Sequence, residues 1–550
     1  MLKFQWRFES FFLVLILLLF FIDGTKAQTF ESELPVVVIN TNGKVISHDS
    51  KITATMGIIM NTDGTLNHPD DPFNNYSGTI GIEYRGQASF ILFPKKNFSI
   101  ETRNTDGTNF NTSLMGLPAE NDWILYGPYT DKTLIRNALT FSLGFKTGHY
   151  GSRCIFSELF INDNYLGLYV LMEKIKIDKN RVRISKLDPD DNGGDSLTGG
   201  YILKLDKEFD GLNGWTSKFK VAGKNVNIMY HDPKYADLTA QQKTYIKGYM
   251  DNFEAILNGP NFADPVNGYR KYIDVNSFID YFLINELTRN VDSYQISAFF
   301  YKQRDSKGGK LVMGPLWDYD YGWGLCYYSS GYKPNGWIKD GIIDNVDDWP
   351  IPFWWDKLLQ DESYRNQLKC RWIELRATIL SDNSVLNTID SMVNVMGSSI
   401  DRNFNKWDII NESVPPNKYI AGSFESEVQY VKDWAQDRLK WMDENLYGDC
   451  PGTNLNQPLQ TMEKYNVYPN PFDDFVTVKI QTQEYPSLNI NISDVTGRLM
   501  YNEILPYRMG ESYEYSIRLA KNGINLPSGI YLLTITSNSQ IVYINKIVKR

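Results

Sequence analysis

The sequence is poor in the residues that build zinc sites and catalytic triads. Only four histidines occur in 550 residues, and they are scattered along the chain, which argues against a histidine-built zinc site and a Ser-His-Asp triad. The four cysteines fit no zinc-binding spacing, and the sequence alone leaves three disulfide pairings open. They are Cys154, Cys326, Cys370 and Cys450. Any bound metal should therefore be a hard cation held by carboxylates.

Long apolar runs and blocks of basic residues are also scarce. The run from Phe11 to Ile22 follows Lys3 and Arg7 and precedes Ala27, which is the pattern of a secretory signal peptide over residues 1–27. A membrane anchor is the alternative, but the run is shorter than the roughly 20 residues of a spanning helix. No later segment is apolar enough to cross a bilayer, and a net charge of −9 without a Lys/Arg cluster excludes an obvious nucleic-acid surface. We expect an exported protein whose mature chain has no transmembrane segment.

The remaining chain divides into a large mixed domain and a small β-rich tail. A hydrophobic fraction of 42% is sufficient for packed cores. Alternating and β-branched segments predict strands at 35–39, 51–60, 78–86, 95–101, 157–162, 165–171, 199–206, 298–302 and 310–313. Apolar residues at three- and four-residue intervals predict helices at 131–147, 239–257, 275–289, 352–380, 382–403 and 422–446. This order predicts an α+β domain over residues 28–447, with a strand-rich lobe before a helical lobe.

The tail begins after a segment rich in Pro, Gly, Asn and Gln. Residues 448–464 are predicted to be a linker, and residues 465–550 a small Ig-like β-sandwich. Its strands are predicted at 476–480, 488–493, 513–517, 529–536 and 541–548.

A pair of carboxylates gives the clearest chemical signal. Asp318 and Asp320 lie two residues apart in the segment 314–322, after the predicted strand 310–313. In a strand both side chains would point to the same face, and two like charges at one place are costly unless a cation lies between them. Mg²⁺ suits such a site because it binds one or two carboxylates together with substrate phosphates. A pair of aspartates capping a turn is the alternative.

Another acidic residue precedes this pair in the chain. Asp292 follows the end of the predicted helix 275–289, and the predicted strand 298–302 leads from it towards Asp318. Kinases place a catalytic-loop Asp before a metal-binding Asp in this order, the first orienting the acceptor hydroxyl and the second holding Mg²⁺ against the phosphates. A helix end followed by an Asx turn is the alternative.

Two further segments combine polar and basic residues. The segment 85–96 sets cations and a hydroxyl around a glycine turn, where they can reach a polyphosphate, and its alternative is an exposed basic hairpin. The segment 117–139 leads into a helix that contains Arg136 and Asn137. These two polar residues either serve the site or tie down the loop before the helix.

Together the motifs resemble the spore coat protein H (CotH) kinase family over about residues 50–445. The resemblance rests on the Arg85-Gly86 hairpin, the Pro-Lys-Lys strand, the Asp-Lys-Thr…Arg-Asn segment, the hairpin ending in Glu173-Lys174, the Gly-Gly-Tyr-Ile-Leu strand and the block at 314–320. It implies an atypical kinase fold that binds ATP with Mg²⁺ or Mn²⁺ and phosphorylates protein Ser or Thr. It also implies Asp292 as the catalytic residue.

The remaining site residues follow from the motifs and from this resemblance. The predicted nucleotide-binding residues are Arg85, Ser89, Lys95, Lys96, Arg136 and Glu173. The predicted metal ligands are Asp318, Asp320 and Ser297. Ser297 stands five residues after Asp292, where a typical kinase has an asparagine that holds the second metal ion, and no G-x-G-x-x-G loop is present.

The tail carries a separate resemblance. The segments 468–472, 494–498 and 526–531, with the terminal 546–550, are similar to the C-terminal sorting domain of type IX secretion in Bacteroidota. This implies the type IX secretion machinery as a partner, passage through the periplasm, and release or attachment at the cell surface. An ordinary Ig-like accessory domain is the alternative.

Three functional hypotheses follow from the sequence. The first is an exported CotH-like kinase acting on an exported or surface protein. The second is a kinase-fold adhesin or scaffold without catalysis. The third is a glycan-active enzyme, for which two carboxylates would have to flank a sugar.

Overall fold

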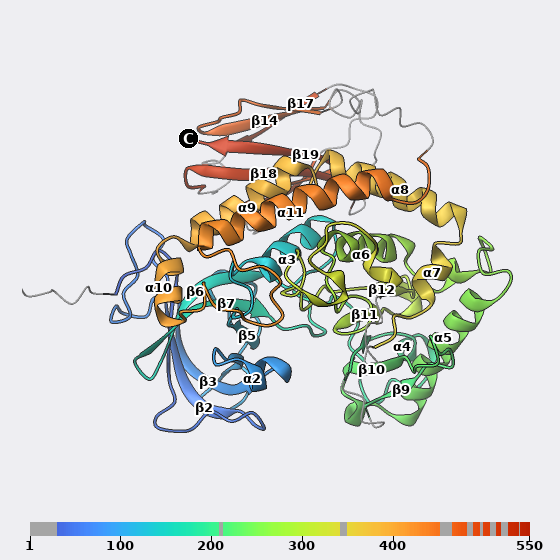
Figure 1. Cartoon of the computed structure of the whole chain (residues 1–550), viewed down its shortest axis with the longest axis horizontal. Helices are drawn as coiled ribbons and strands as arrows, with labels where there is room; N and C mark the ends of the chain where they lie inside the picture. Colours follow the sequence, from blue (N-terminus) through green and yellow to red (C-terminus); the bar gives the residue numbers. More distant parts are fainter. Residues whose placement is uncertain are drawn as a thin grey trace, which may run out of the picture.

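The computed structural model describes residues 30–207, 213–341, 349–450, 465–480, 488–494, 499–505, 513–518, 526–537 and 540–550. The predicted signal peptide, 1–27, lies outside the described residues, as does the part of the predicted linker from 451 to 464. The described chain mixes helices with sheets up to residue 450 and consists of strands and loops after residue 464 (Figure 1). The α+β class is therefore confirmed. None of the helices in the described part is long and apolar enough to cross a membrane.

A closed barrel forms from the first seven strands, in the order β1-β2-β3-β4-β5-β7-β6. They are β1 (Val36–Asn40), β2 (Ile52–Ile59), β3 (Tyr76–Arg85), β4 (Asn97–Arg103), β5 (Asp122–Tyr126), β6 (Cys154–Ile161) and β7 (Asn164–Glu173). Neighbouring strands are antiparallel except β1 and β6, whose parallel pairing closes the barrel. Side chains such as Ile80, Trp123 and Leu171 fill one apolar core. The barrel is thus a packed body rather than a channel.

Two helices are inserted between barrel strands. The short α2 (Ala88–Leu92) follows β3, and α3 (Arg136–Lys146) follows β5. Helix α3 buries Leu139, Phe141 and Leu143 and packs against the helices α6 and α9 of the second half of the domain. It therefore connects the barrel to the rest of the domain.

A second sheet has five antiparallel strands in the order β12-β11-β8-β10-β9. They are β8 (Tyr201–Leu205), β9 (Gly214–Thr216), β10 (Asn227–Asp232), β11 (Ala298–Lys302) and β12 (Leu311–Met313). β11 pairs with β8 on one side and with the edge strand β12 on the other, so the acidic motifs flank this pair: Asp292 precedes β11, and Asp318 and Asp320 follow β12. The second half of the domain, predicted to be rich in helices, thus also contains a sheet, and the strands predicted at 298–302 and 310–313 are two of its members.

The remaining helices all follow β7 in the chain, and the one at Ser399–Lys406 packs against this barrel strand. They are α4 (Gly194–Leu197), α5 (Ala240–Asn258), α6 (Val275–Thr288), α7 (Trp354–Leu358), α8 (Glu362–Ala377), α9 (Asp382–Met396), α10 (Ser399–Lys406) and α11 (Phe424–Asn445). Each of the two long helices predicted at 352–380 and 382–403 is two helices. Asp361 starts α8 by accepting a hydrogen bond from the Ser363 amide, and Gly397 ends α9 with φ at 47°.

The C-terminal part has two antiparallel sheets, β13-β14-β17 and β16-β15-β18-β19. The strands are β13 (Tyr465–Tyr468), β14 (Phe475–Ile480), β15 (Leu488–Asp494), β16 (Leu499–Leu505), β17 (Tyr513–Arg518), β18 (Gly529–Ser537) and β19 (Gln540–Lys549). Val478, Ile490 and Leu533 belong to one apolar core shared by both sheets. Ile544 of β19 packs against the core of the large domain, and Figure 1 shows the strands lying over α9 and α11.

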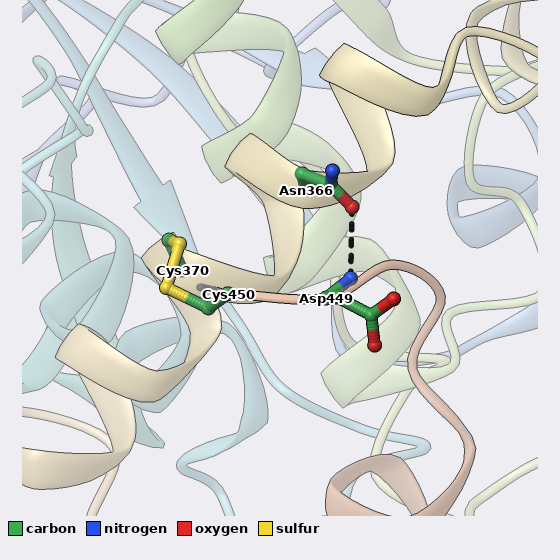
Figure 2. The surroundings of a disulfide bond; sticks show 4 residues. All are labelled: Asn366, Cys370, Asp449 and Cys450. Carbon is green, nitrogen blue, oxygen red and sulfur yellow. Dashed lines mark hydrogen bonds between the residues drawn. A yellow bond between two sulfur atoms is a disulfide. The ribbon is translucent and has the colours of Figure 1, made fainter. Parts of the chain in front are cut away.

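A disulfide bond joins Cys370 of α8 to Cys450, which decides among the three pairings (Figure 2). The Asp449 amide also donates to Asn366 Oδ1 at 2.8 Å, one turn earlier in α8. The first residues of the predicted linker are thereby fastened to α8 of the large domain. Cys154 and Cys326 are free thiols.

Removing this disulfide should weaken the fold. The bond spans 80 residues, so a Cys370→Ser variant should lose about 2–4 kcal/mol of unfolding free energy, because its unfolded chain gains freedom. Urea unfolding of the full mature chain measures this difference, and Cys154→Ser is the control for loss of a thiol outside a disulfide. Equal urea midpoints for Cys370→Ser and wild type would contradict the prediction.

Candidate active site

The loop between α6 and β11 holds Asp292. Helix α6 ends where Arg289 adopts a left-handed conformation, with φ at 48°. The Asp292 carbonyl then accepts a hydrogen bond from the Ile296 amide at 3.0 Å, which closes a turn. An Asx-type turn, the alternative for this segment, is made by Asn290, whose Oδ1 accepts from the Asp292 amide at 3.4 Å. The half-buried Asp292 side chain remains available to a ligand.

The segment after β12 holds Asp318 and Asp320. The two residues lie in a loop beyond Met313 and not in the strand itself, and Asp318 has a left-handed φ of 56°. Ser297 Oγ donates to Asp318 Oδ2 at 2.8 Å. This bond brings together two of the predicted metal ligands, from the loop before β11 and the loop after β12.

The three aspartates act on one another electrostatically. Burial raises the pKa of Asp292 to about 6, with Lys207 opposing and Asp318 reinforcing the rise. Burial, followed by the negative charges of Asp318 and Asp292, raises the pKa of Asp320 well above its usual range. Surrounding protein raises the pKa of Asp318 as well, although its side chain is open to solvent and Arg85 opposes the shift. The site therefore concentrates negative charge that a cation would relieve.

Arg85 is the predicted nucleotide-binding residue that lies at these carboxylates. It ends β3, and its guanidinium carbon is 5.4 Å from the centre of the Trp317 ring. Burial lowers its pKa, and the Asp318 charge opposes that shift. A cation from the barrel thus lies next to the carboxylates of the second half.

The donor set suits a hard divalent cation. Carboxylate and hydroxyl oxygens are what Mg²⁺ and Mn²⁺ prefer, and Mg²⁺ needs only one or two carboxylates when phosphates supply the rest. In the described part of the chain, no three His, Cys, Asp or Glu side chains are grouped closely enough to hold a metal alone. Asp318 and Asp320 therefore fit a metal that binds together with a phosphate ligand better than a metal held by protein alone.

Lys95 and Lys96 are engaged elsewhere. The Lys95 ammonium is buried and donates to Asn403 Oδ1 at 2.7 Å and to the Pro128 carbonyl at 3.2 Å. The Lys96 ammonium donates to the carbonyls of Phe90 and Phe93 and so holds the end of α2. These bonds leave neither ammonium presented to a phosphate in this structure.

The other three predicted nucleotide-binding residues also have internal partners. Ser89 Oγ accepts from Asn97 Nδ2 at 3.3 Å. The buried Arg136 is bonded to Asp131 at the start of α3. The buried Glu173 receives two bonds from the Arg153 guanidinium, at 2.9 and 2.7 Å. The structure thus places only Arg85 of this group beside the three aspartates.

Two asparagines at the site were not among the predicted ligands: Asn137 was left as either a site residue or a tie for the loop before its helix, and Asn290 had no predicted role. Asn137 of α3 accepts from the Tyr319 amide, and Asn290 donates to the Asp318 carbonyl. Both lie inside segments that the sequence analysis singled out. In the sequence, the signal for Asn137 was an amide side chain on an otherwise apolar helix face, and the signal for Asn290 was an amide next to a helix end.

The burial of Lys95 has a measurable consequence. Burial lowers its pKa to about 7, so the folded chain loses this proton at a lower pH than the unfolded chain. Unfolding then takes up a proton between about pH 7 and 10, and the free energy of unfolding should rise with pH there. Lys95→Met should remove about 1–3 kcal/mol of the rise between pH 7 and 9. Urea unfolding at both pH values measures it. Lys310→Met, an exposed lysine, should behave as wild type, and an unchanged slope in Lys95→Met would contradict the prediction.

Comparison with known proteins agrees with the resemblance seen in the sequence. The family model for CotH kinase protein matches residues 82–442, and the model for the secretion system C-terminal sorting domain matches residues 466–550. No curated protein matches. Among solved structures, Pseudomonas fluorescens alkylpurine DNA glycosylase AlkC bound to DNA containing an abasic site analog matches with 11% identity and a TM-score of 0.11. That match covers 39% of this chain and 58% of the glycosylase chain.

The two family models divide the chain in the same way as the structure. The first covers the barrel from β3 and the helices up to α11, and the second covers the two sheets of the tail. The sorting domain indicates an exported protein, secreted or at the cell surface, that uses type IX secretion. The first model covers most of the large domain and more than half of the chain. The chain belongs to the CotH kinase protein family.

Proposed function

We propose that this protein is an exported kinase that transfers the γ-phosphate of ATP to a Ser or Thr hydroxyl of an exported or surface protein, with Mg²⁺ or Mn²⁺. One observation carries the proposal. Asp292, Asp318 and Asp320 come from two separate loops, and still Asp318 raises the pKa of both other aspartates and Asp292 raises that of Asp320, with Arg85 beside Asp318. An atypical kinase fold with two lobes would be consistent with a barrel followed by a mixed sheet-and-helix half.

Each residue then has a defined role. Asp318 and Asp320 would hold the divalent ion, which when bound neutralises charge on the phosphates. Arg85 would face the phosphates from the barrel side. Asp292 orients the acceptor hydroxyl and receives its proton as the hydroxyl oxygen bonds to the γ-phosphorus and the bond to the ADP oxygen breaks. Positioning and electrostatics provide nearly all of the rate in such transfers.

The route to the acceptor is part of the proposal. The sorting domain supports recognition by the type IX secretion machinery after passage through the periplasm. The acceptor would then be a protein that is itself exported. The Ig-like character of the tail is consistent with two antiparallel sheets around one core.

A second candidate is a catalytically silent surface adhesin or scaffold. Ser297 favours it, because a hydroxyl is a weaker ligand than the asparagine that holds the second metal in a typical kinase. The lack of a three-carboxylate group in the described residues points the same way. A metal-poor site slows or prevents transfer without altering the fold.

The test is ATP binding and transfer by the full mature chain. Calorimetric titration should give ATP binding that needs Mg²⁺ or Mn²⁺ and is lost in EDTA. Labelled phosphate should then pass from ATP to the protein itself or to a Ser-rich protein. ATP binding without any transfer, with either metal, would favour the scaffold. No ATP binding with either metal would overturn the kinase proposal.

A further inference from the structure

We propose that Asn137 and Asn290 are positioning residues that clamp the peptide group between Asp318 and Tyr319, and thereby set the directions of the Asp318 and Asp320 carboxylates. The inference deepens the proposed kinase function, on which its catalytic meaning rests. The clamp itself is a structural statement that can be tested without catalysis.

Both hydrogen bonds end on one peptide unit. Asn137 Oδ1 accepts from the Tyr319 amide at 2.6 Å, and Asn290 Nδ2 donates to the Asp318 carbonyl at 2.8 Å. The carbonyl and the amide are the two ends of the same planar group. Both asparagines are at least nine-tenths buried, with 6% and 2% of their surface exposed, so water is a poor substitute for either bond.

The chemistry of the peptide group fixes the role of each asparagine. A backbone amide can only donate and a carbonyl can only accept, so Asn137 must present its oxygen and Asn290 its nitrogen. The other end of Asn290, its Oδ1, accepts from the Asp292 amide at 3.4 Å. Asn290 therefore bridges the loop that carries Asp292 and the loop that carries Asp318.

The clamp explains an unusual backbone conformation. Asp318 has φ at 56°, a region that non-glycine residues seldom adopt. Rotation of the peptide to a commoner conformation would turn the carbonyl away from Asn290 and the amide away from Asn137. A third bond, from the Tyr319 hydroxyl to Asn285 Oδ1 at 2.8 Å, anchors the side chain between the two aspartates. The backbone on both sides of Tyr319 is thereby fixed, and with it the two carboxylates.

The two asparagines belong to different parts of the domain. Asn137 lies in α3, which follows the barrel strand β5, and Asn290 lies directly after α6. The loop that carries Asp318 and Asp320 is thus held by one asparagine from each part. A shift of α3 relative to α6 would disturb the carboxylates before it affected the packing of either half.

The experiment compares two variants, each of which replaces one asparagine of the clamp with aspartate. Both therefore add one negative charge next to the same peptide group. Asn137→Asp keeps an oxygen acceptor facing the Tyr319 amide, whereas Asn290→Asp sets a carboxylate oxygen against the Asp318 carbonyl. In the full mature chain, Asn290→Asp should raise the Mn²⁺ concentration for half-maximal ATP binding by about tenfold, the equivalent of one lost hydrogen bond. Asn137→Asp should shift it clearly less. Thr140→Val is the control, because it removes the bond from α3 to Trp323 but leaves the peptide clamp intact.

Hydrogen exchange, followed by mass spectrometry of fragments containing Tyr319, tests the clamp without ligands. Asn137→Ala should speed exchange at this amide at least tenfold, while Asn137→Asp should leave it slow. Asn290→Ala replaces Asn290→Asp if the latter melts below wild type, and it should show the same rise in Mn²⁺ requirement. Equal Mn²⁺ shifts in the two Asp variants would overturn the positioning role in favour of a charge effect. Unchanged exchange in Asn137→Ala would overturn the clamp. A wild-type protein that binds no ATP would overturn the kinase proposal and the positioning role with it, and the exchange result would still judge the clamp.

Discussion

An Asp292→Ala variant is expected to bind ATP with wild-type affinity and to transfer phosphate at least a hundredfold more slowly, because general-base groups commonly contribute a factor of 10²–10⁴. Asp292 lies in the loop before β11, and its carbonyl and amide maintain the turn whatever its side chain. The substitution therefore removes the carboxylate that orients the hydroxyl and leaves the backbone in place. Radiolabel transfer to the protein itself and to a Ser-rich acceptor measures the rate, and calorimetry measures ATP affinity.

Two companion variants sharpen this result. Asp237→Ala removes an exposed carboxylate and should behave as wild type. Ser297→Asn should keep a donor towards Asp318 Oδ2 and add a better metal ligand, so its transfer rate should equal or exceed that of wild type. If Asp292→Ala transfers labelled phosphate at the wild-type rate, the prediction is wrong, and Asp292 has only a structural role after the helix.

The second large effect is expected at the carboxylate pair. Asp320→Asn and Asp318→Asn should each abolish Mg²⁺-dependent ATP binding, because each removes one of two carboxylates available to the metal. Asp320→Asn should also stabilise the metal-free protein at neutral pH. Burial, together with Asp318 and Asp292, raises the pKa of Asp320, so ionisation of this carboxyl opposes folding.

The sign of the pH dependence follows from this shift. Above about pH 4 the unfolded chain releases this proton while the folded chain retains it, so wild-type stability falls as pH rises towards the raised folded pKa. Asp320→Asn lacks this fall and should be more stable than wild type at pH 7 in EDTA, with little difference at pH 4. Thermal melting of both proteins at pH 4 and pH 7 measures this difference in stability. Mg²⁺ should raise the melting temperature of wild type and not of either variant. A destabilised Asp320→Asn protein at pH 7 would contradict the proposed repulsion.

Much of the fold could be predicted because its strands and helices bury regular apolar patterns. The strand expected at 298–302 is β11 (Ala298–Lys302), and the helix expected at 275–289 is α6 (Val275–Thr288). The five-residue β5 (Asp122–Tyr126) was not predicted, because its pattern is too short to separate from the loops around it. Closure of the barrel by β1 and β6 depends on contacts more than 100 residues apart, which no local pattern indicates.

The site was predictable in its acidic residues and less so in its cations. A pair of aspartates in an otherwise apolar segment is conspicuous, and the structure brings Asp292 to it. Lys95 and Arg85 look alike in the sequence, but Arg85 at the end of β3 lies over Trp317, whereas Lys95, just before β4, is buried against Asn403. The role of Asn137 was left open and that of Asn290 was not predicted, because a buried amide gains its role only from the backbone it meets.

The Cys370–Cys450 bond also determines how the protein carries tension. A pull on the tail reaches Cys450, crosses to α8 through the sulfur atoms, and bypasses α9, α10 and α11 entirely. The 80 residues between the two sulfurs cannot be drawn out while the bond is intact, which withholds about 280 Å of extension at roughly 3.5 Å per residue. The helix α11, which packs against α6, is therefore bypassed by force that passes along the chain from the sorting domain.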